Sequence, residues 1–161
     1  MNYFAPPILN NTNGITAGIT YSNREEFNQK ASIPGLNFGE NTDVPMHLVK
    51  RNLSLLNEIL GHTGDIALAE QVHGAEVKTV TKAGYYKGAD GLITNRSDLL
   101  LGIKVADCAA ILMADSDAGV LAAVHAGWRG ASSHILPNAL NKMIGLGASP
   151  GQIRCYLSPC L

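Results

Sequence analysis

Two apolar runs near the middle of the chain are separated by only three residues, which leaves no room for a crossover helix between them. The runs are AAILMAD (109–115) and GVLAAVH (119–125), and the connection is SDA (116–118). Ser and Asp favour tight turns, and the glycine that follows them suits a hairpin. The pair therefore predicts a β-hairpin, and a hairpin here argues against a plain doubly wound parallel sheet.

Further strands and two helices are predicted on either side of this hairpin. Strand-like runs occur at 66–72, 75–80 and 99–105, and the Asn-, Gly- and Thr-rich segment before Gly39 suggests short strands joined by turns. Residues 42–61 show helical spacing of apolar residues, and Gly61 stands where a C-terminal cap would fall. The second predicted helix, 135–145, has an apolar face made of Ile135, Leu136, Ala139, Leu140, Met143 and Ile144. We therefore expect an α/β mixture.

Composition limits the class of protein. The chain has 161 residues, of which 46% are hydrophobic, so a single globular domain with one sizeable core is the simplest expectation. Twelve basic and thirteen acidic residues give a net charge of -1, without a basic run that would bind nucleic acid or a membrane surface. Three cysteines and no leader-like or membrane-spanning segment favour a reduced, cytoplasmic protein.

Three segments place a metal-capable side chain at the end of an apolar strand. They are QVHG (71–74), VADC (105–108) and AVHAGWRG (123–130), and their donors are His73, Cys108 and His125. Two imidazoles and a thiolate would make three legs of a tetrahedral zinc site with the fourth position open. The alternative is that Cys108 is a small buried hydrophobe and the histidines are hydrogen-bonded loop residues.

The order of four short motifs resembles a known family. QVHG, ADG (89–91), ADC (106–108) and HAGWRG (125–130) are similar to the signature of the YfiH-like family, also called the laccase-domain or multicopper polyphenol oxidase family. LNFG (36–39) also resembles that family. The resemblance implies mixed β-sheets sandwiched by helices, a cytoplasmic metalloenzyme, and zinc ligands at His73, Cys108 and His125.

The resemblance also implies an activity. Members of the family are similar to purine nucleoside phosphorylases acting on adenosine, inosine, guanosine and methylthioadenosine, and some also deaminate adenosine. The implied partners are thus a purine nucleoside and phosphate. Laccase activity is not expected, because a multicopper oxidase needs a blue-copper site and a three-copper cluster, whereas this chain has five histidines in all. We therefore expect zinc rather than copper.

Catalytic and phosphate-binding roles follow from the same reading. Catalysis is assigned to the three expected ligands and to Asp90 of the ADG motif, which could act in acid–base chemistry or simply form a turn. Arg129 and Arg51 are candidates for phosphate, because a guanidinium group matches a tetrahedral oxyanion. Alternatively, Arg129 pairs with a structural carboxylate and Arg51 lies on the solvated face of its helix.

Three other residues have weaker claims on substrate. Asn37 could hydrogen-bond the ribose or the base, although Asn before an aromatic residue and Gly is also ordinary turn chemistry. Gln71 could hydrogen-bond at the site because it is close to His73. Trp128 could stack on a purine, but we expect it to fill the core beneath the 125–130 turn.

The C-terminal end departs from the family pattern. Members continue for several tens of residues, so residues 1–161 are expected to form one domain that is incomplete at its C-terminus, and an exposed sheet edge there would favour a homo-oligomer. Two rival functions remain: a cysteine hydrolase in which Cys108 is the nucleophile, and an inactive module that binds a nucleoside or a protein partner.

Overall fold

The chain separates into two compact units in a computed structural model, which describes residues 3–12, 14–20, 38, 45–62 and 64–161. The first unit comprises residues 1–6 and 16–63, and the second comprises residues 7–15 and 64–161. Within the described ranges, no helix is long and apolar enough to cross a membrane. One domain over residues 1–161 stays a prediction.

The described residues of the first unit form a long helix and a two-stranded sheet. Helix α2 spans Met46–Leu60, and strands β1 (Tyr3–Phe4) and β2 (Ile19–Thr20) pair antiparallel. Gly61 follows the helix with a φ of 62°, in the left-handed region that glycine adopts without a steric penalty. Its N–H group bonds to helix carbonyls, as a C-cap requires. The predicted end of this helix is therefore confirmed.

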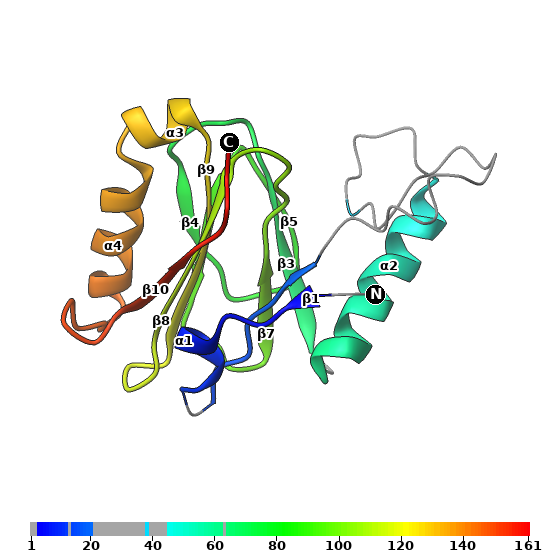
Figure 1. The fold of residues 1–161 in the computed structure, drawn as a ribbon, viewed down its shortest axis with the longest axis horizontal. Coiled ribbons are helices and arrows are strands. Elements are labelled where there is room, and N and C mark those ends of the chain that lie inside the picture. Colours follow the sequence, from blue (N-terminus) through cyan, green and yellow to red (C-terminus); the bar gives the residue numbers. More distant parts are fainter. Residues whose placement is uncertain (1–2, 13, 21–37, 39–44, 63) are drawn as a thin grey trace. The chain divides into compact units, whose positions relative to one another are not determined.

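The second unit is built on two sheets (Figure 1). Its strands are β3 (Asp65–Glu70), β4 (Val77–Thr79), β5 (Gly84–Lys87), β6 (Gly91–Thr94), β7 (Leu99–Gly102), β8 (Ala109–Asp115), β9 (Val120–Ala126) and β10 (Arg154–Leu157). One sheet has the order β10-β8-β9-β6-β4, and the other has the order β5-β3-β7. In the five-stranded sheet β4 and β6 are parallel, whereas β6–β9, β9–β8 and β8–β10 are antiparallel. The predicted hairpin is β8–β9, and the mixed α/β fold is confirmed.

Strand β6 lies at the centre of this unit, and all four of its residues are buried. Ile93 belongs to a core cluster with residues of helix α4 (Ile135–Gly145), while Leu92 belongs to a cluster with residues of β3. Helix α4 thus covers one side of the five-stranded sheet and the three-stranded sheet covers the other (Figure 1). Burying each large aliphatic side chain contributes about 1.5–3 kcal/mol, so β6 stabilises both layers.

Two short helices complete the second unit. They are α1 (Pro7–Asn10), which contacts β10 and buries Leu9, and α3 (Trp128–Ser132), which follows β9. In α4 the buried face is narrower than predicted: Ile135, Ala139 and Met143 are fully buried, but Ile144 is 43% exposed. Strands β5, β6 and β10 lie outside the strand-like runs predicted from the sequence.

A buried carboxylate holds the β8–β9 turn against the segment after α4. The side chain of Asp115, 1% exposed, accepts hydrogen bonds from the backbone N–H groups of Ser149 at 2.8 Å and of Ala118 and Asp117 at 3.1 Å. These bonds favour the ionised form, so they lower the pKa of Asp115 below its ordinary value, the bond from Ser149 having the largest effect.

We expect Asp115→Asn to lower the free energy of unfolding by an amount that depends on pH. Because the folded-state pKa is lowered, the ionised carboxylate stabilises the fold at neutral pH, and this contribution is lost as the pH falls from about 4 through the lowered pKa. Urea unfolding of both proteins across this range should show a difference that shrinks on acidification. The exposed Asp117→Asn is the control, and a pH-independent difference for Asp115→Asn would contradict the assignment.

Candidate metal centre

The β8–β9 hairpin brings two of the predicted ligands to one end of the five-stranded sheet. His125 is the penultimate residue of β9 and lies opposite Ala110 on β8. Cys108 immediately precedes β8. Residues opposite or diagonal to each other on antiparallel strands lie within side-chain reach. The hairpin register therefore places the thiol of Cys108 and the imidazole of His125 in the same neighbourhood.

Pairing between β6 and β9 places Asp90 beside His125. The N–H of His125 donates to the carbonyl of Asp90 at 2.7 Å, and Nδ1 of His125 lies 2.8 Å from Oδ1 of the Asp90 carboxylate. An ionised carboxylate can only accept hydrogen bonds, so Nδ1 carries the proton. The lone pair of His125 is then on Nε2, which is the arrangement that carboxylate–histidine–metal sites use.

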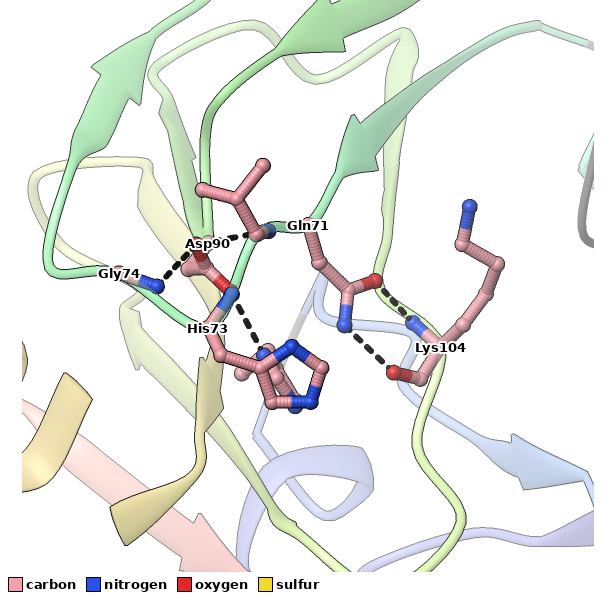
Figure 2. Close-up of polar contacts among 7 residues, drawn as sticks. Gln71, His73, Gly74, Asp90 and Lys104 are labelled. Atoms are coloured by element: carbon pink, nitrogen blue, oxygen red, sulfur yellow. Dashed lines mark hydrogen bonds and ion pairs between the residues drawn. The ribbon is translucent and has the colours of Figure 1, made fainter. Parts of the chain in front are cut away.

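The same carboxylate also holds the turn that carries His73. Asp90 is fully buried, and it accepts hydrogen bonds from the backbone N–H groups of Val72 at 3.1 Å, His73 at 2.9 Å and Gly74 at 2.8 Å. Figure 2 shows this carboxylate directed at the turn. Together with Nδ1 of His125, four N–H groups converge on one side chain. Asp90 thus joins the 72–74 turn, which lies between β3 and β4, to strand β9.

His73 has a backbone conformation that few non-glycine residues adopt. Its φ is 61°, and among the described residues His134 is the other non-glycine residue with a positive φ. The hydrogen bond from its N–H to Asp90 helps to hold this conformation. The turn presents the exposed ring of His73 next to the buried ring of His125, with ring centroids 4.8 Å apart and ring planes at 86°.

The glycines of the 125–130 motif leave space where chain segments approach closely. A Cβ atom on Gly127 would lie 3.1 Å from Sγ of Cys108 and 3.3 Å from Cδ2 of His73. A Cβ on Gly130 would lie 2.6 Å from the carbonyl oxygen of Gly74, which is a severe clash. Helix α3 can therefore pack directly on the 72–74 turn only because position 130 has no side chain.

Three donor atoms, one each from His73, Cys108 and His125, all lie within 4.8 Å of one another. Donors held at 2.0–2.3 Å from a tetrahedral ion are about 3.5 Å apart, so the side chains need to close by about 1 Å to share one ion. Two imidazole nitrogens and one sulfur suit zinc, and three protein ligands leave one position open. The group could hold a metal ion that is reachable from solvent on the His73 side.

Gln71, which the sequence suggested as a substrate-binding residue, is hydrogen-bonded to the protein backbone. Its Nε2 donates to the carbonyl of Lys104 at 2.6 Å, and its Oε1 accepts from the N–H of Lys104 at 2.8 Å (Figure 2). Both polar atoms of the side chain thus contact the segment that leads to Cys108.

Trp128 does not fill the core, so that expectation is wrong. Its side chain is 78% exposed, because the residue that packs against the 72–74 turn is Gly130. The guanidinium carbon of Arg129 lies 5.6 Å from the centroid of the Trp128 ring, a cation–π arrangement. Arg129 is an exposed residue of α3, four residues after His125, and remains a candidate for phosphate.

The structure tests neither of the two remaining predicted substrate residues. Arg51 is an exposed residue of α2 in the first unit, and Asn37 lies outside the described residues. Sequence reasoning missed the role of Lys104 and the strand that Asp90 precedes. The short apolar run LIT (92–94) after Asp90 and Gly91 was the available signal for that strand.

Comparisons with known proteins agree with the motif resemblance. A sequence model of the family described as "Multi-copper polyphenol oxidoreductase laccase" matches residues 19–161. A protein named purine nucleoside phosphorylase from Deinococcus radiodurans is 35% identical over 125 residues, which are 78% of this chain and 49% of that protein. Another of the same name from Corynebacterium glutamicum is 35% identical over 126 residues, 75% and 51% of the two chains. A protein named adenosine deaminase RL5, from an unknown prokaryotic organism, is 26% identical over 129 residues, 74% and 49% of the two chains.

Solved structures share the fold. The hypothetical protein YfiH from Bacillus licheniformis superposes with a TM-score of 0.76 and 26% identity, covering 82% of this chain and 54% of that chain. YlmD from Geobacillus stearothermophilus gives 0.75 and 28%, covering 82% and 53%. The chain therefore spans about half the length of the relatives that it matches. With most of its sequence matched by the family model and its fold shared with YfiH, the chain belongs to the multi-copper polyphenol oxidoreductase laccase family, that is, the YfiH family.

Proposed function

We propose that this chain carries the metal centre of a zinc-dependent purine nucleoside phosphorylase, with a purine nucleoside and phosphate as its substrates. The main support is the convergence of His73, Cys108 and His125 at one end of the sheet. The second support is the 35% identity to proteins named purine nucleoside phosphorylase. The chain spans about half the length of those relatives, so their activity is only a proposal for this chain. The experiment below tests it on the chain itself.

Zinc is proposed over copper, although the family description names a multicopper enzyme. Two histidines and a cysteine could also form a blue-copper site, but polyphenol oxidation needs a three-copper cluster in addition, and that cluster takes many more histidines. Five histidines in the chain are too few. In the part of the chain that the structure describes, one group of metal-capable residues is present.

Phosphorolysis joins a phosphate oxygen to C1′ of the ribose and breaks the bond from C1′ to the purine nitrogen, so that ribose 1-phosphate and the free base are formed. A zinc ion held by the three ligands would supply Lewis-acid polarisation of an oxygen nucleophile. Arg129, exposed at the start of α3 beyond His125, is proposed to bind phosphate through its guanidinium group. Water in place of phosphate would give hydrolytic chemistry at the same centre.

Asp90 is proposed as a positioning residue rather than an acid–base catalyst. Its carboxylate is fully buried, and both oxygens already accept hydrogen bonds from four N–H groups. It holds Nδ1 of His125 protonated and fixes the turn of His73. Because the side chain of Asp90 is buried, substrate is not expected to contact it.

Adenosine deamination is a second candidate. The observation that favours it is the 26% identity to a protein named adenosine deaminase. Deamination replaces the amino group of the purine with the oxygen of a water molecule and releases ammonia, and an open Lewis-acid site serves that reaction as well.

The deciding experiment is chromatographic detection of products from adenosine and inosine, with and without phosphate. We expect phosphate-dependent release of free base from the zinc-loaded chain. In Cys108→Ala this release should fall by at least about 100-fold, because Lewis-acid stabilisation is worth several kcal/mol. Inosine formed from adenosine without phosphate would support the deaminase.

Cys155→Ala is the matched control, because Cys155 is an exposed cysteine on β10 and is proposed neither as a metal ligand nor as a catalytic residue. The control should keep the activity of the unmodified chain. A folded, zinc-loaded chain that forms neither product would show that the proposed activity does not extend to this polypeptide.

The rival assignment, a cysteine hydrolase, is separated by alkylation. A thiolate bound to zinc is protected, so iodoacetamide should modify Cys108 slowly until a chelator is added, whereas a free catalytic thiolate reacts at once. Peptide mass spectrometry at timed intervals measures this rate for each cysteine. Rapid modification of Cys108 before chelation would favour the hydrolase.

Asp90→Asn should weaken zinc binding by about 10- to 100-fold, as loss of the partner of a ligating histidine commonly does. The amide nitrogen would face N–H donors, and we expect a loss of about 1–3 kcal/mol in the free energy of unfolding. Competition with a chromophoric chelator measures the zinc affinity, and urea unfolding measures the stability. Asp117→Asn, at an exposed site, is the control. Zinc affinity unchanged in Asp90→Asn would rule out the positioning role.

A further inference from the structure

Gln71 connects the two segments that lead out of the three-stranded sheet toward the metal centre. Strand β3 ends at Glu70 and strand β7 at Gly102, and the parallel register of this pair runs to Leu68 opposite Gly102. Beyond this pair, one segment leads to the 72–74 turn and the other leads to Cys108. Gln71 is the first residue after β3.

The side-chain amide of Gln71 takes the place of a further rung of the parallel ladder. Its N–H group donates to the carbonyl of Lys104, and its oxygen accepts from the N–H of Lys104. A backbone peptide in a parallel sheet makes the same two kinds of bond. Both residues are partly buried, which limits competition by water. Figure 2 shows the two bonds side by side.

These bonds complete the connections between the three ligands. The bonds of Asp90 run from the 72–74 turn to His125. The bonds of Gln71 run from the residue just before that turn to Lys104, four residues before Cys108. His73 is two residues beyond Gln71. Asp90 therefore sets the spacing between the two histidines, and Gln71 sets the position of the thiol-bearing segment relative to them.

We propose that Gln71 is a positioning residue for the metal ligands, which holds the segment of Cys108 close enough to His73 for the two side chains to reach one ion. This inference rests on the metal centre proposed above. It replaces the substrate contact that the sequence suggested for Gln71, because both polar atoms of the amide are engaged with Lys104. Only glutamine has the length, the donor and the acceptor that the two bonds need.

The test is the zinc affinity of Gln71→Met, which keeps the length of the side chain and removes both hydrogen bonds. We expect the affinity, measured by competition with a chromophoric chelator, to fall about tenfold or more. Cobalt(II) substitution is the second readout: the thiolate-to-cobalt charge-transfer absorption should weaken, because it reports ligation by Cys108. Gln71→Glu, which retains an acceptor for the N–H of Lys104, should lose affinity too and serves if the Met variant does not fold.

Gln152→Met is the matched control. Gln152 is exposed and precedes β10, whose first residue pairs with Ala114 at the end of β8 away from Cys108. It should bind zinc and cobalt like the unmodified chain. Unchanged affinity and cobalt spectrum in folded Gln71→Met would overturn the inference, as would a raised KM for nucleoside with unchanged zinc affinity. An unmodified chain that binds no zinc would instead overturn the proposed metal centre, and this inference with it.

Discussion

The hydrogen bonds around the carboxylate of Asp90 are the interaction on which the second unit depends most. An ionised carboxylate without partners costs several kcal/mol to bury, and here it is fully buried among four N–H donors from two separate segments. Removing either segment would leave part of this charge unsatisfied. Folding of the 72–74 turn and orientation of the His125 ring are therefore parts of one equilibrium, which links stability to the geometry of the ligands.

The layered core explains why this carboxylate stands where it does. Strand β6 is covered on one face by α4 and on the other by the three-stranded sheet, so its position is set by apolar packing. Asp90 immediately precedes β6, so the packing that fixes β6 also fixes the position of Asp90. The ligands then differ in a useful way: His125 is buried and fixed, Cys108 is partly buried, and His73 is exposed. A metal ion here would have an inner wall of protein and an open outer side.

Features with a local signal were predictable from the sequence. The hairpin followed from SDA and Gly119, the end of α2 from Gly61, and the three donors from their positions at strand ends. The hydrogen-bond partners of Asp90 lie 16 to 35 residues away in the sequence. Local sequence patterns indicate an Asp-Gly turn there but cannot predict these partners. Strand β6 has four residues, too few for a periodic signal. Trp128 is exposed because Gly130 is the residue that packs against Gly74. The spacing of residues in the sequence does not predict this contact.

The register of the hairpin also has a kinetic consequence. Cys108 and His125 are brought together by a turn of a few residues, whereas His73 joins them through the β4–β6 and β6–β9 pairs, which close longer loops. Closing a short loop costs less entropy and is faster. We therefore expect the two ligands on the hairpin to come together before His73 joins them, and an ion bound at that stage would have only two protein ligands until β6 packs against β9. Retention of metal would mark the end of folding rather than its beginning.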